Sequence, residues 1–170
     1  AEFFGDHMVV NGFIWPKADV EPASYRIHLL NGCDSRFMGI SFLAVNAGET
    51  DFTTAGDPID FRVIGSDQGL ANSATTTDLL LFEPGSRYDI IFDFQGLQGK
   101  RVIMKNIGLD SPFNGDFDDG DEFPNRRTDR IMAFDVSAGS STPSFDDSGI
   151  DGRFGPQVGT VDSIRQVALF

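Results

Sequence analysis

The inventory of strong ligands for a blue copper site in this sequence is His7, His28 and Cys33. Two imidazoles and one thiolate are the strong ligands of a mononuclear blue copper site. No histidine follows Cys33, however, and the sequence contains no His-x-His pair from which a multinuclear site could be built. His28 also falls on the polar side of its predicted strand, pointing away from a core. We therefore predict no catalytic and no metal-ligating residue here, with Cys33 a small buried side chain in a turn.

An acidic loop at residues 109–127 is the second group with possible chemistry. Asp116, Asp118 and Asp121 could gather oxygen ligands for a hard cation such as calcium. Gly120 does not occupy the turn position that an EF-hand requires, so the loop does not match that motif. A solvated, charged loop explains the same composition, and the residues alone leave both interpretations open.

These side chains must be positioned by strands, because the apolar pattern has a period of two. In residues 78–94, Pro84 and Gly85 form a turn between two strand-like runs. From Tyr88 to Phe94 apolar residues alternate with polar or mixed ones, as in a half-buried strand. Such a corner predicts that the Tyr88 hydroxyl bonds back across it, as in Greek-key sandwiches.

The remaining strands are short and are separated by Gly, Pro and Asn. Asn11-Gly12 suits the type I′ turn of a hairpin at residues 7–15. Further strands are predicted at residues 24–30, 37–44, 59–64, 99–107 and 130–136. No helical period appears, so the predicted fold class is all-β, an antiparallel Greek-key β-sandwich or barrel. We expect one domain at residues 1–136 and a linker or tail at residues 137–170.

Five charged residues near the predicted turns could form an ion-pair network: Arg26, Arg36, Asp67, Arg87 and Asp89. As partly exposed pairs, each would contribute only about 0–1 kcal/mol.

Composition excludes several classes of function. The 170 residues include 26 acidic and 13 basic side chains, and the resulting net charge of −13 opposes binding to nucleic acid. No run approaches the roughly 20 apolar residues of a membrane span. The single cysteine rules out an internal disulfide.

A set of short motifs occurs in one order along the chain. They are Val10-Asn11-Gly12, Pro16, Val20-Glu21-Pro22, Tyr25-Arg26, Leu29-Leu30-Asn31-Gly32-Cys33, Arg36, Ile64-Gly65-Ser66-Asp67, Gly69-Leu70 and Pro84-Gly85-Ser86-Arg87-Tyr88-Asp89. This order resembles the middle, cupredoxin-like domain of a three-domain multicopper oxidase, of the spore-coat laccase, bilirubin oxidase or cuprous oxidase type. The resemblance covers residues 5–136.

The resemblance implies a function that belongs to a longer parent chain. The parent would oxidise phenolic, bilin-like or metal-ion substrates one electron at a time and reduce dioxygen to water. Its type 1 copper and trinuclear copper cluster would lie in the first and third domains, which are the expected partners of this chain. This domain would hold no copper and would act as a spacer with two apolar faces. Leu109, Pro112 and Phe113 would form part of a substrate rim.

Both ends of the sequence suggest a segment of a longer chain, and the resemblance implies export to the periplasm, the medium or a cell or spore surface. One alternative of another class stays open. The chain could be a stand-alone, non-catalytic sandwich that binds a cation or a protein partner through its acidic loops.

Overall fold

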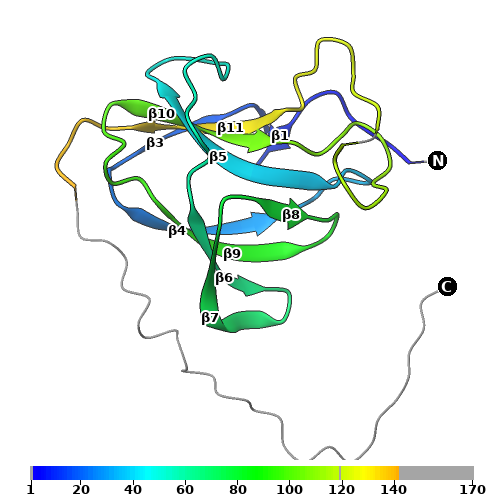
Figure 1. Cartoon of the computed structure of the whole chain (residues 1–170), viewed down its shortest axis with the longest axis horizontal. Coiled ribbons are helices and arrows are strands. Elements are labelled where there is room, and N and C mark those ends of the chain that lie inside the picture. Colours follow the sequence, from blue (N-terminus) through cyan, green and yellow to red (C-terminus); the bar gives the residue numbers. More distant parts are fainter. Residues whose placement is uncertain (1, 119, 142–170) are drawn as a thin grey trace, which may run out of the picture.

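The structure is a computed structural model that describes residues 2–118 and 120–141, and all its regular elements are strands (Figure 1). A five-stranded sheet contains, in spatial order, β3 (Lys17–Val20), β11 (Arg130–Val136), β10 (Lys100–Asn106), β5 (Met38–Asn46) and β8 (Leu80–Phe82). A four-stranded sheet contains β4 (Ser24–Leu30), β9 (Arg87–Asp93), β6 (Phe61–Ser66) and β7 (Gly69–Thr77). A small hairpin pairs β1 (Val9–Val10) with β2 (Phe13–Ile14).

The two larger sheets form a sandwich, which confirms the predicted fold class. All strand pairs are antiparallel except β3 and β11, which run parallel along the edge of the five-stranded sheet. The sequence pattern did not indicate this parallel pair, because period-two alternation carries no information on strand direction. The chain crosses between the sheets twice in succession, since β8 lies in one sheet while β7 and β9 lie in the other.

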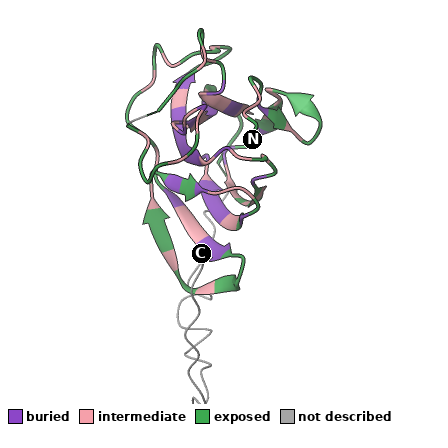
Figure 2. Cartoon of the chain, turned by 90° about the vertical axis from the view of Figure 1, so that its right-hand side faces the viewer, coloured by how far each residue is buried: buried purple, intermediate pink, exposed green. Residues whose placement is uncertain are grey.

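Phenylalanine side chains fill the space between the sheets. Phe42 of β5 contacts Phe92 of β9, Phe61 of β6 and Phe134 of β11, with ring centroids 4.4, 5.2 and 6.4 Å apart. Phe94 extends this cluster toward Phe134 at 5.2 Å. Buried residues gather on the strands that face each other across the sandwich (Figure 2). Because this core joins both sheets, it holds the loops at the sandwich ends in fixed positions.

The predicted Pro-Gly corner between β8 and β9 is tied down by a buried asparagine. Gly85 has a φ of 81°, which favours glycine, and its N–H donates to the carbonyl of Asn31 at 2.8 Å. The Asn31 amide nitrogen donates to the carbonyls of Arg36 and Phe82 at 3.0 and 2.9 Å. Asn31 therefore connects the end of β4 to the crossover between the sheets.

The tyrosine predicted to bond across a corner was the wrong one. The hydroxyl of Tyr25, not that of Tyr88, accepts a hydrogen bond from the backbone N–H of Glu21 at 3.0 Å. Tyr88 instead packs edge-on against Phe82, with ring centroids 5.7 Å apart. Within the described residues no helix could span a membrane. The predicted division at residue 137 remains a prediction, since residues 142–170 lie outside the described part.

On the outer face of the five-stranded sheet, Asp135 joins three strands. Arg101 of β10 donates two hydrogen bonds to its carboxylate, at 2.6 and 3.0 Å, and Lys17 of β3 lies 3.1 Å away. The Arg101 hydrogen bonds are the main cause that lowers the pKa of Asp135, and Lys17 adds to the effect against the opposing effect of burial. A carboxyl with a lowered folded-state pKa stabilises the fold above its unfolded-state pKa.

The ion pair between Asp135 and Arg101 should make part of the unfolding free energy pH-dependent. We expect the stabilisation by Asp135 to be lost as the pH falls below about 4, through the lowered folded-state pKa. Asp135→Asn should therefore flatten the loss of unfolding free energy between about pH 5 and pH 2, measured by urea denaturation. Asp57→Asn, at an exposed position, is the control. Equal pH slopes for Asp135→Asn and the unsubstituted chain would exclude this role.

Candidate functional site

The loop between β10 and β11 carries the predicted rim residues. Pro112 is exposed, whereas Leu109 and Phe113 are half-buried. The Phe113 ring stacks on Phe37 with centroids 4.6 Å apart and an interplanar angle of 16°. It also contacts Phe117 at 5.1 Å. The structure thus places Phe113 in an aromatic cluster whose members Phe37 and Phe117 were not predicted as rim residues.

Phe117 packs close to the backbone of β5. A Cβ atom at Gly39 would lie 2.8 Å from the Phe117 Cε2 atom and 2.5 Å from the Ile107 Cγ1 atom. Only glycine leaves room for this approach. Only its aromatic side chain, in an otherwise acidic loop, could have indicated from the sequence that Phe117 belongs to this cluster. Nothing in the sequence distinguishes Phe37 from a core residue.

A buried ion pair anchors the base of this loop. The Arg36 Nη2 atom donates to the Asp110 Oδ1 atom at 2.7 Å, and the two side chains are 3% and 0% exposed. The same Oδ1 atom accepts from the Thr128 hydroxyl at 2.6 Å, and the Oδ2 atom accepts from the N–H of Phe123 at 2.9 Å. Arg126 adds a second positive charge at 3.7 Å from Oδ2. Both carboxylate oxygens are therefore satisfied by protein groups.

Arg36 binds more than the carboxylate. Its Nη2 atom also donates to the carbonyl of Gly5 at 2.8 Å, and its Nε atom to that of Leu109 at 3.4 Å. The N-terminal segment, the start of β5 and the loop are joined through this one guanidinium. The five charged residues expected to form one network do not form it: Arg26 pairs with Asp89 and Arg87 with Asp67, while Arg36 pairs with Asp110, which was not among the five. The prediction of partial exposure is wrong for Arg36.

Asn106, the last residue of β10, holds the beginning of the loop. Its side-chain oxygen accepts from the N–H groups of Gly39 and Gly108 at 3.1 and 2.8 Å. Its side-chain nitrogen donates to the carbonyls of Gly108 and Thr128 at 3.1 and 2.9 Å. Because Asn106 is fully buried, these four bonds fix where the loop leaves and rejoins the sheet.

The carboxylates predicted as a cation loop lie on the exposed side of the same loop. Asp116 accepts from the N–H of Asp118 at 3.2 Å, and the N–H of Asp121 donates to the Ser111 hydroxyl at 3.0 Å. Among residues 2–118 and 120–141, no group of three or more His, Cys, Asp or Glu side chains is placed to hold a metal ion. The cation loop therefore stays a prediction.

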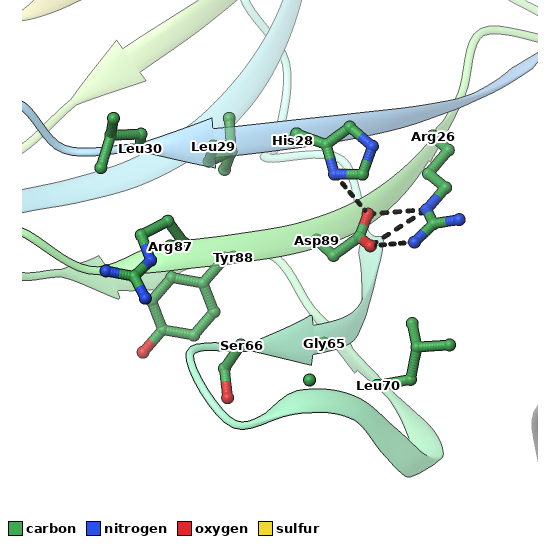
Figure 3. A pocket seen from close by; sticks show the side chains of 11 residues that line it. Arg26, His28, Leu29, Leu30, Gly65, Ser66, Leu70, Arg87, Tyr88 and Asp89 are labelled. Carbon is green, nitrogen blue, oxygen red and sulfur yellow. Dashed lines mark hydrogen bonds and ion pairs between the residues drawn. The ribbon is translucent and has the colours of Figure 1, made fainter.

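A second ionic cluster lines a hollow of about 350 Å³ on the outer face of the four-stranded sheet (Figure 3). The Arg26 Nε atom donates to both carboxylate oxygens of Asp89, at 2.9 and 3.0 Å, and the His28 Nδ1 atom lies 3.4 Å from Oδ1. The His28 ring is directed toward Asp89 (Figure 3). His7 is bonded to Asp6 at 2.6 Å and lies against Trp15. The two imidazoles are thus engaged with different partners.

Apolar side chains are exposed at several places, and two of these bear on function. The first is the hairpin surface, which we define as Val9, Phe13 and Ile14 of β1 and β2; these residues are 56–70% exposed. The second includes Leu30 and Leu70, which border the hollow in Figure 3. Contiguous exposed apolar groups of this kind mark interaction sites in soluble proteins.

Comparisons with known proteins agree with this geometry. No family model matches the chain. The bilirubin oxidase of Albifimbria verrucaria is 34% identical over 141 residues, which are 83% of this chain and 23% of that protein. The laccase of Bacillus subtilis is 35% identical over 104 residues, 61% of this chain and 18% of that protein. The chain thus spans about a fifth of the length of these relatives.

Solved structures show the same fold. The McoA multicopper oxidase of Aquifex aeolicus matches 87% of this chain and 31% of its own, with 25% identity and a TM-score of 0.60. The laccase-like multi-copper oxidase CueO of Ochrobactrum sp. matches 94% of this chain and 29% of its own, with 22% identity and a TM-score of 0.62. On the sequence relatives and the shared sandwich together, the chain belongs to the multicopper oxidase family, as a cupredoxin-like domain.

Proposed function

We propose that this chain is the middle domain of a three-domain multicopper oxidase and holds none of its redox copper ions. The parent would take single electrons from phenolic, bilin-like or metal-ion substrates and reduce dioxygen to water. This domain would set the spacing between the first and third domains, so that they assemble the trinuclear cluster at their shared interface. The parent would be an exported protein.

The donor set of the chain supports a copper-free role. A blue copper site needs two imidazoles and a thiolate on one ion. The sequence has two histidines, and the His28 ring is directed to Asp89 while His7 is bonded to Asp6. A trinuclear cluster would require many more histidines than the chain contains. The residues therefore do not fit either type of copper centre, and no electron-transfer step is assigned to them.

The exposed hairpin surface is the observation that carries the spacer role. Val9, Phe13 and Ile14 present large apolar side chains to solvent, although the interior of the sandwich is well filled with phenylalanine. Apolar surface in contact with water raises the free energy of the domain, and burial against a neighbouring domain removes this contribution. The hollow beside Leu30 and Leu70, on the outer face of the four-stranded sheet, is the second surface that a neighbour could cover.

The anchored loop supports the second part of the role, a wall of the substrate approach. The Arg36–Asp110 pair and Asn106 fix the base of the loop, and the stacked Phe37 and Phe113 rings stiffen its outer part. Pro112 is exposed next to this stack. A rigid apolar rim of this kind would limit which reductants reach the third domain.

The test removes the hairpin surface in the intact parent protein. Phe13→Ser with Ile14→Ser should lower the trinuclear copper content and the rate of dioxygen uptake, because the first and third domains lose their alignment. Leu79→Ser, at an exposed apolar position outside the hairpin, is the matched control. Full copper loading and unchanged dioxygen uptake in the double variant would refute the spacer role of the hairpin.

A further inference from the structure

A cavity of about 550 Å³ lies beside the hairpin and reaches into the core of the sandwich. It is lined by every methionine of the sequence, by its only cysteine and by both of its histidines: Met8, Met38, Met104, Met132, Cys33, His7 and His28. Among the described residues, no Asp, Glu, Lys or Arg lines this cavity. Although 23% of the residues of the chain are charged, this cavity collects sulfur donors, and Asn11 is the one side chain of its described lining with an amide oxygen.

The sulfur-bearing side chains reach the cavity from separate elements. Met104 of β10 and Met132 of β11 are direct cross-strand partners, so their Cβ atoms lie about 5 Å apart. Met38 begins β5, Met8 precedes β1, and Cys33 follows β4. Met8, Met38 and Met104 are buried. These donors are therefore held by the sandwich itself and by the segment that leads into the hairpin.

Methionine often fills irregular gaps in a core, and such a role would need no ligand. Here the methionine side chains border an open volume, so gap filling does not account for their placement together. Thioether and thiolate sulfurs select soft ions such as Cu(I), whereas calcium and magnesium need several oxygen ligands, and no carboxylate is among the described residues that line this cavity. A neutral apolar cavity also disfavours a divalent ion, because the cost of burying charge rises steeply with that charge.

We propose that this cavity is a binding site for one soft monovalent metal ion, Cu(I) or Ag(I), held by methionine thioethers and the Cys33 thiolate. Burial raises the pKa of the Cys33 thiol, and the positive charge of Arg36 partly offsets this effect. On binding, a sulfur–metal bond forms and the thiol proton passes to solvent. No electron is transferred, and the ion stays monovalent.

This site differs from a blue copper centre, and the two can be told apart. A blue centre holds Cu(II) between two imidazoles and a thiolate. Both imidazoles of this cavity already have a carboxylate partner, because His7 Nδ1 lies 2.6 Å from Asp6 and the His28 ring is directed to Asp89 (Figure 3). Cu(I) and Ag(I) have filled d shells and give no blue band. Failure of this proposal would therefore leave the spacer role unchanged, and failure of the spacer role would leave this site unchanged.

The test is titration of the 170-residue chain with Ag(I), and with Cu(I) under anaerobic conditions in competition with a Cu(I) chelator. We expect one ion per chain, an X-ray absorption spectrum dominated by sulfur ligands, and no binding of Ca²⁺. Met38→Leu with Met104→Leu conserves side-chain volume and should weaken binding at least about tenfold. Cys33→Ser should also weaken binding, because it removes the thiolate ligand. Circular dichroism checks that each variant is folded.

Asp57→Asn is the control, since it changes an exposed side chain that does not line the cavity, and it should leave the affinity unchanged. Four results would overturn the proposal. They are no binding of either ion, an affinity of the methionine or cysteine variant equal to that of the unsubstituted chain, a first shell of oxygen and nitrogen atoms without sulfur, or binding that is weakened by Asp57→Asn.

Discussion

Asp110→Asn should lower the free energy of unfolding of this chain by about 3–5 kcal/mol. Removing the carboxylate leaves the Arg36 guanidinium, 3% exposed, without its charge partner in the protein interior. It also weakens the bonds from the Thr128 hydroxyl and the Phe123 N–H that close the loop. A loss of this size corresponds to a fall in Tm of roughly 6–20 °C. The loss of unfolding free energy is measured by urea denaturation, followed by fluorescence.

Asp89→Asn is the matched control, because it changes the same group in an ion pair whose arginine is half-exposed. We expect a loss of only about 0–1 kcal/mol there. The contrast tests burial as the cause, since the charge change is identical in the two variants. If Asp110→Asn cost no more than Asp89→Asn, the loop would not depend on the buried pair.

Phe42→Ala should have an effect of similar size, about 3–5 kcal/mol, for a different reason. The ring is fully buried and contacts Phe61, Phe92 and Phe134 across the sandwich. Its removal leaves a cavity between the two sheets that these rings cannot fill without leaving their own contacts. The measurement is again urea denaturation of the 170-residue chain.

Phe13→Ala provides the comparison within the same residue type. Phe13 is 70% exposed in the hairpin surface, so its removal should change the unfolding free energy of the isolated chain by less than about 0.5 kcal/mol. A large loss for Phe13→Ala would mean that the hairpin packs on its own domain and is not free for a neighbour. A small loss for Phe42→Ala would mean that the core of the sandwich lies elsewhere.

Much of the strand pattern could be predicted from the sequence. The predicted bounds of residues 24–30 and 130–136 coincide with β4 and β11, because alternating apolar residues and flanking turns define these strands. β7 was missed. It is an edge strand rich in Thr, Ser and Ala, and its mostly exposed side chains carry no apolar alternation. The two halves of residues 78–94 were predicted as neighbouring strands, but β8 and β9 lie in different sheets.

The candidate site was predicted less well than the fold. Asp110 lies in a stretch so rich in Asp that a solvated loop was the natural interpretation. Its partner Arg36 is 74 residues away, and no local pattern connects the two. The contact between Phe113 and Phe37 likewise joins a loop to the start of β5. Pairings of this kind depend on how the sheets fold together, which a single sequence does not display.

The central claim is that this chain is a spacer that holds no redox copper ion. Its most direct test compares the isolated 170-residue chain with the intact parent protein, after both have been loaded with Cu(II) under the same conditions. We expect the parent to show a blue thiolate band and to take up dioxygen in the presence of a phenolic reductant, while the isolated chain does neither. A blue band from tightly bound Cu(II) in the isolated chain would contradict it and would make this domain an electron carrier in its own right.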